Sequence, residues 1–267
     1  MSGRSTRILI PLALATVVVM AAPAQSQWDS YERMTAESLR SALARVSGAP
    51  AQLTGKNFSN LDLQGVDFRG ANLSSSVFNG ARLMHARLDR TNLTVSFLER
   101  ADLSHASLQG AMLFSVQLAG GTLQHANLSG ARLIGDLRRT DLSGANLTRV
   151  NAAADMKNQS MGLMNTLMVN AKAVGADFSN SDFSRANFSF ADLSGARMHR
   201  TQLMRADLSG ATLAGADLTG ANLQDAEIID TDFSKANLSG ADFTGATFRG
   251  VRGLDTAITT GARGLPP

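Results

Sequence analysis

Few residues of this chain could do chemistry, and histidine is the most informative of them. The chain contains four histidines, and three of these, His85, His105 and His125, are spaced twenty residues apart. Imidazoles that come together on a surface can bind anions when protonated, or supply nitrogen ligands to a metal ion. Whether these three meet depends on how the chain between them folds.

The sequence lacks the other patterns that signal catalysis or cofactor binding. It has no cysteine, which excludes disulfides, thiolate catalysis and cysteine-based zinc sites. It has no Gly-x-Ser-x-Gly, no His-Glu-x-x-His and no phosphate loop, because Gly55-Lys56 lacks the required first glycine and the following Ser or Thr. We therefore predict no catalytic residues, no cofactor and no dedicated metal site, and we do not expect an enzyme.

The elements that must position any surface site come from a five-residue repeat that runs from about residue 56 to 248. The unit reads Ala-(Asp/Asn)-(Leu/Phe)-x-x, as in Ala71-Asn72-Leu73 and Ala206-Asp207-Leu208. A period of five is neither the 3.6 of an α-helix nor the two of a β-strand. The large apolar residue and the small residue two positions before it are expected to share one interior. The outward Asp and Asn are expected to hydrogen-bond turn backbone rather than to act as catalytic acids or bases.

These repeats, which fill most of the chain, resemble the pentapeptide-repeat family. The resemblance implies an all-β fold, a right-handed quadrilateral β-helix in which four pentapeptides make one square coil and the coils stack. Some members of that family protect DNA gyrase by imitating duplex DNA. The resemblance therefore supplies an alternative function, which would require a strongly acidic rod in the cytoplasm.

In a square coil, residues twenty apart stack in one column, so the three histidines would lie on successive coils. The same interval then continues the column through Asn165, Arg185, Arg205 and Asp225. We predict that a surface stripe contacts an anionic polymer or an acidic protein face, more strongly at mildly acidic pH. That predicted stripe consists of His85, His105, His125, Arg185 and Arg205. The alternatives are a partial metal site on the imidazoles, and a duplicated repeat that merely inherited its surface residues.

The repeat is disturbed between residues 134 and 162. Its leucines first come one residue early, at Leu137, Leu142 and Leu147, and Leu163 returns to the original phase. We predict a register slip over 134–162 in which one residue is lost and later regained, so that coils before and after stay aligned. Residues 150–162 are predicted to form a bulge or excursion that is either functional or drifted repeat. Outward apolar residues such as Val95, Met112 and Phe114 need no special explanation when they are isolated.

Residues 1–24 are predicted to be a signal peptide. Arg4 and Arg7 precede an apolar stretch over residues 8–22, and Ala22-Pro23-Ala24 favours cleavage near Ala24 and Gln25. Cleavage removes two arginines and no acidic residue, which leaves 23 basic against 22 acidic residues and a net charge of +1. We predict a periplasmic or secreted protein without a stable membrane span after cleavage.

Three further segments follow the predicted signal peptide. Residues 25–55 form an N-terminal segment with a capping helix over 35–46, residues 56–258 form the β-helix, and residues 259–267 form a short tail. The predicted function is an exported, non-enzymatic structural or interaction module that binds an unknown protein or an anionic envelope component. No nucleic acid is expected, because the near-neutral charge disfavours the gyrase alternative. A homodimer through a coil end is a further expectation.

Overall fold

The computed structural model describes residues 28, 30–44, 50–154 and 165–267. The chain divides into two units, Met1–Ser30 and Tyr31–Pro267, and the architecture below is that of the second unit. The predicted signal peptide and its cleavage site near Ala24 lie outside the described residues, and so does Leu163.

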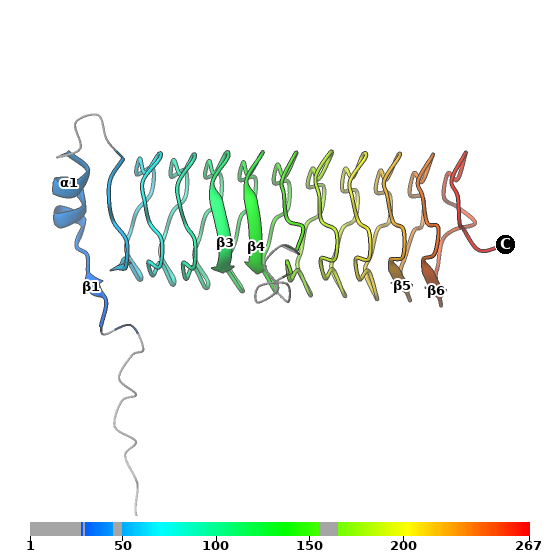
Figure 1. Ribbon diagram of the computed structural model, residues 1–267, viewed down its shortest axis with the longest axis horizontal. Coiled ribbons are helices and arrows are strands. Elements are labelled where there is room, and N and C mark those ends of the chain that lie inside the picture. Colours follow the sequence, from blue (N-terminus) through cyan, green and yellow to red (C-terminus); the bar gives the residue numbers. More distant parts are fainter. Residues whose placement is uncertain (1–27, 29, 45–49, 155–164) are drawn as a thin grey trace, which may run out of the picture. The chain divides into compact units, whose positions relative to one another are not determined.

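The second unit is a solenoid of stacked coils (Figure 1). Residues twenty apart form parallel bridges, as between Arg82 and Asp102 and between Asp182 and Gln202. Because each side takes five residues, a twenty-residue coil has four sides. The predicted fold, a right-handed quadrilateral β-helix, is confirmed.

Continuous strands are short, because the chain turns every five residues. They are β1 (Glu32–Arg33), β2 (Lys56–Asn57), β3 (Met112–Gln117), β4 (Arg132–Asp136), β5 (Glu227–Ile229) and β6 (Thr247–Arg249). They pair in parallel as β1 with β2, β3 with β4, and β5 with β6. The ladder of bridges begins at Gln52 and ends at Arg263, so the β-helix extends beyond the predicted 56–258 at both ends.

The interior is filled by the two apolar positions of each repeat. Leu103, Leu142 and Leu213 are completely buried, as are the small residues beside them. Phenylalanines stack along the axis, as Phe58 does on Phe78 with ring centroids 4.6 Å apart. Where the small residue is Ser or Thr, its hydroxyl donates to a carbonyl oxygen inside the coil, as the Oγ of Ser76 does to Leu53 at 2.8 Å and the Oγ1 of Thr201 to Phe178 at 2.9 Å. These core hydroxyls therefore have hydrogen-bond partners inside the coil.

The outward Asp and Asn residues hold the turns together. The backbone N–H of Ser104 donates to the Oδ1 of Asp102 at 3.0 Å, and that of Ser129 donates to Asn127 at 3.1 Å. The last residue of each side, which we call the corner residue, has a positive φ in most coils, for example +59° at His105. These carboxylates and amides therefore serve the backbone, as the sequence predicted.

The twenty-residue spacing between coils is interrupted after Ser115 and returns, displaced, from Leu167 onward. In β3 and β4, Phe114 pairs with Ile134 and Val116 pairs with Gly135, so Ser115 has no counterpart in the next coil. The bridges that follow join residues 19 apart, such as Thr122 and Asp141, and those of the next coil join residues 31 apart, such as Asp141 and Lys172. One corner residue is thus missing and eleven residues are inserted.

The predicted alignment of the coils across this slip was wrong. The five-residue phase does return, because Met168 is completely buried in the interior. However, losing one residue and inserting eleven displaces the twenty-residue register by ten, which is two sides of the square. A five-residue pattern in the sequence cannot reveal this displacement, because every side has the same pattern.

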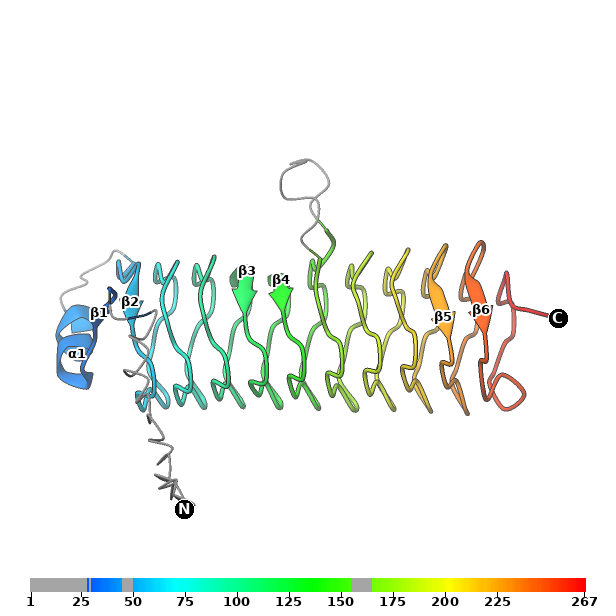
Figure 2. The same cartoon turned by 90° about the horizontal axis from the view of Figure 1, so that it is seen from below.

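A single helix, α1 (Ala36–Ala44), lies against the first coil of this unit (Figure 2). Thr35 caps its start: the N–H of Ser38 donates to the Oγ1 of Thr35 at 3.1 Å, and the N–H of Thr35 donates to the Oγ of Ser38 at 2.9 Å. Leu39 is buried in the same apolar cluster as the coil interior, and Leu43 packs against that cluster. The helix therefore covers apolar residues that the first coil would otherwise expose.

Candidate interaction surfaces

The three histidines form what we call the histidine ladder: His85, His105 and His125. Each is an exposed corner residue, with φ between +56° and +59°. The ring centroids of His85 and His105 are 5.1 Å apart, those of His105 and His125 are also 5.1 Å apart, and in both pairs the ring planes differ by 19°. The predicted stacking of the three rings is therefore present.

The arginines of the predicted stripe do not lie on this ladder. The N–H of His125 donates to the carbonyl of Ser143, and that of Gly144 donates to Val174. The ladder column therefore continues through Gly144, Gly175, Gly195, Gly215 and Lys235. The prediction of a single stripe was wrong, because the ten-residue displacement moves every later residue by two sides.

Arg185 and Arg205 belong instead to the column of Asp225. The N–H of Arg205 donates to the carbonyl of Gln224, and its Nε lies 3.3 Å from the Oδ2 of Asp225. The Nδ2 of Asn165 donates to the carbonyl of Arg185 at 3.2 Å. This column therefore mixes both charge signs and does not extend the histidine ladder.

The described part of the chain offers no group of three or more His, Asp or Glu side chains able to hold a metal ion. The three imidazoles follow one another along the axis instead of converging on a point.

In several columns of the outer faces, basic and acidic side chains pair between neighbouring coils. The Nη1 of Arg82 lies 3.2 Å from Asp62, that of Arg87 lies 3.3 Å from Asp67, and Lys172 and Asp141 are 3.8 Å apart. A hydrogen bond from Arg69 lowers the pKa of Asp67. These exposed pairs contribute little to stability, but they prevent long runs of one sign.

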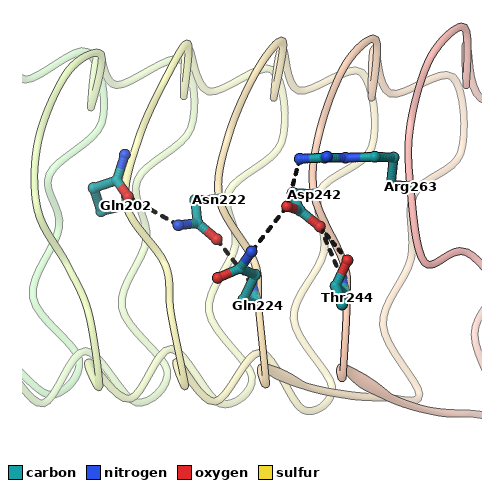
Figure 3. A network of polar contacts seen from close by, with 6 residues as sticks. All are labelled: Gln202, Asn222, Gln224, Asp242, Thr244 and Arg263. Atoms are coloured by element: carbon teal, nitrogen blue, oxygen red, sulfur yellow. Dashed lines mark hydrogen bonds and ion pairs between the residues drawn. The ribbon is translucent and has the colours of Figure 1, made fainter.

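A network of polar side chains lies near the C-terminal coils (Figure 3). Its residues are Gln202, Asn222, Gln224, Asp242, Thr244 and Arg263. The carboxylate of Asp242 accepts from the hydroxyl of Thr244 at 2.6 Å, from the side-chain amide of Gln224 at 2.9 Å and from Arg263 at 2.7 Å. The hydroxyl and backbone N–H of Thr244, then Gln224 and the charge of Arg263, lower the pKa of Asp242 to about 2. The network ties four successive coils together, from the coil of Gln202 to that of Arg263.

One face carries a shallow groove of about 540 Å³, which we call the 90–114 groove. It is lined by Arg90, Thr91, Asn92, Thr94, Gly110, Met112 and Phe114. Met112 is 45% exposed, and the neighbouring Val95 is 43% exposed. In the sequence Val95, Met112 and Phe114 were expected to be isolated apolar residues. The fold instead brings them onto two adjacent coils.

In the described residues, no helix has the length and apolar character needed to cross a membrane.

The chain belongs to the pentapeptide-repeat family. A family model described as pentapeptide repeats matches in eight copies. The matched residues are 51–90, 81–114, 113–153, 163–200, 201–240 and 226–250. Proteins of this family are generally non-enzymatic structural or interaction modules.

Solved structures of other pentapeptide-repeat proteins resemble the chain. One is HetL, involved in heterocyst differentiation regulation in the cyanobacterium Nostoc sp. strain PCC 7120, with 30% identity, coverage of 84% of this chain and 96% of HetL, and a TM-score of 0.40. Another is QnrB1, a plasmid-mediated fluoroquinolone resistance protein, with 16% identity, coverage of 74% of this chain and 89% of QnrB1, and a TM-score of 0.37. No curated protein matches the chain.

Proposed function

We propose that the protein is an exported, non-enzymatic module that binds other molecules through the outer faces of its β-helix. The observation that carries this proposal is the filled interior, in which the central Leu and Phe side chains are completely buried along the axis. The outward Asp and Asn side chains are largely occupied by turn hydrogen bonds. Such a molecule offers surfaces for recognition, not a pocket for substrate turnover.

Export is proposed from the N-terminal sequence alone. The basic residues, the apolar stretch and Ala22-Pro23-Ala24 support a signal peptide and a periplasmic or secreted protein. N-terminal sequencing of the natural protein after cell fractionation tests this. We expect a first residue near Gln25 in the periplasm or medium, and an intact N-terminus in the cytoplasm would refute export.

The proposed partner is an acidic protein or an anionic envelope component, and the histidine ladder is the proposed contact. Protonated imidazoles on successive coils would present a short row of positive charge at mildly acidic pH. Binding to an anionic envelope polymer should be stronger at pH 5.5 than at pH 7.5. Changing His85, His105 and His125 together to Asn should abolish this difference. Arg185→Gln with Arg205→Gln should not, because those arginines lie on another column.

A DNA-mimicking protector of DNA gyrase is the less well supported alternative. DNA mimicry needs continuous rows of acidic side chains. Here the rows alternate in sign, as in the series Asp62, Arg82 and Asp102. Supercoiling assays with gyrase and the processed protein should therefore show no protection.

A homodimer through a coil end is also proposed. Near the C-terminal end of the β-helix, Ile258 is 54% exposed. An exposed coil end presents strand edges that another chain can pair with. Sedimentation equilibrium should then give a dimer that Ile258→Lys weakens, and a monomer at all concentrations would contradict this.

A further inference from the structure

We propose that the 90–114 groove is a docking site for a partner polypeptide segment that carries an apolar side chain beside a carboxylate. This inference rests on the proposed interaction function and assigns it a surface and a partner chemistry.

Apolar residues on two neighbouring coils line or border the groove, with Met112 and Phe114 in its lining and Val95 beside it. The N–H of Val95 donates to the carbonyl of Phe114 at 2.8 Å, and the N–H of Leu93 donates to that of Met112 at 2.8 Å. Val95, Met112 and Phe114 therefore lie on neighbouring coils of one face. Scattered apolar residues are ordinary on a surface, but a contiguous group beside a hollow is typical of an interaction site.

These residues break the repeat without benefit to the core. On the preceding coils the same face carries an amide ladder: the Nδ2 of Asn72 donates to Gln52 at 3.2 Å, and that of Asn92 donates to Asn72 at 3.3 Å. Asn92 also accepts from the N–H of Thr94 at 3.0 Å. Met112 occupies the next position of this ladder and cannot continue it. Met112 departs from the repeat without adding to the core or to the amide ladder, and such a departure is typical of a functional residue.

A positive charge borders the apolar patch. Arg90 is an exposed corner residue with φ of +56°, and its stem packs over Gly110. Among the described residues, its guanidinium makes no hydrogen bond or ion pair. The adjacent Asp89 accepts instead from the hydroxyl of Ser107 and from the N–H of Gln109. Arg90 is therefore available to a carboxylate of the partner.

The sharpest test compares the wild type with the double variant Met112→Asn, Phe114→Thr. This variant copies the pattern of Asn92 and Thr94 twenty residues earlier, so it should keep the fold and melt at the wild-type temperature or above. A displayed random peptide library is selected on both proteins. We expect peptides that combine apolar and acidic residues to be enriched on the wild type and not on the variant.

A synthetic representative of the enriched peptides then measures the contribution of the charge. Its affinity should fall about tenfold for Arg90→Gln, as loss of a charged contact predicts. The matched control is Arg149→Gln, which changes a corner arginine of the same column that does not line the groove. Its affinity should equal that of the wild type.

Three results would overturn the docking site: no peptide enrichment on the wild type, equal enrichment on both proteins, or enrichment of basic peptides. A double variant that melts well below the wild type would also overturn it, because Met112 and Phe114 would then be structural. Failure at this groove leaves the histidine ladder and export intact. A cytoplasmic location would refute export without changing the peptide selection, so failure of the export proposal and failure of the docking site can be told apart.

Discussion

The coils from residue 187 to residue 243 and the coils between residues 112 and 182 are built from the same repeat, yet they differ in register. From residue 187 to residue 243, bridges join residues twenty apart, as Asn187 joins Asp207. Between residues 112 and 182, the spacing falls to 19 and then rises to 31. Both regions nevertheless bury their central residues completely, including Leu142 and Leu213.

This comparison shows that the β-helix depends on its sides and tolerates change at its corners. Each side supplies two interior residues and bonds to the coils above and below. A corner supplies only a turn, so the counterpart of Ser115 can be missing from the next coil, and eleven residues can be inserted between Asn151 and Leu167. Insertions and deletions therefore redistribute surface columns while the core continues.

The largest expected effect tests whether the two cores are equivalent. Leu103 and Leu142 are both completely buried, one in a regular coil and one after the dropped corner. Leu103→Asp and Leu142→Asp should each cost roughly 4 kcal/mol or more, because each buries a charge without a partner. Urea unfolding measures both, with Leu103→Met as the control expected to cost under about 1.5 kcal/mol. A mild effect at Leu142 alone would show that the displaced coil is loosely packed.

The next effect concerns the dropped corner itself. Gly135 has a φ of +152°, and a Cβ there would overlap the backbone carbonyl of Val116. Gly135→Ala should cost about 3 kcal/mol, because backbone must move to admit the methyl group. Gly175→Ala is the control, since its φ of +65° is also unfavourable but nothing lies within 4 Å. We expect about 1 kcal/mol there, and equal melting temperatures for the two variants would argue against the tight corner.

The smallest effect is a pH dependence in the regular C-terminal coils. The folded pKa of Asp242 is about 2, below its ordinary value of 3.8. The stabilisation is therefore fully present above pH 3.8 and is lost as the pH falls toward 2. Asp242→Asn should lower the melting temperature at pH 7 and reduce its decline over that acidic window. An unchanged acid profile would mean that the network of Figure 3 does not favour the carboxylate.

The sequence predicted the interior residues well because the large and small apolar positions recur in every five-residue unit. Buried Leu103 and the turn-bonding Asp102 both follow from the five-residue pattern. The pattern could not assign Arg185 to a column, because five-residue phase is the same on all four sides and the insertion changes only the side. The five-residue pattern alone also does not show that Val95, Met112 and Phe114 adjoin, since their adjacency follows only once the twenty-residue coil is known.

Disulfide formation between introduced cysteines can test the displaced register of the coils. The chain has no native cysteine, so introduced pairs report without background. Residues that bridge neighbouring coils have Cα atoms about 5 Å apart, a separation that a disulfide can span. Asn146→Cys with Asp177→Cys, 31 residues apart, should oxidise readily, whereas Asn146→Cys with Leu167→Cys, 21 residues apart, should not. A register without the displacement would pair Asn146 with Leu167 instead. Rapid crosslinking of the second pair and none of the first would contradict the displaced register.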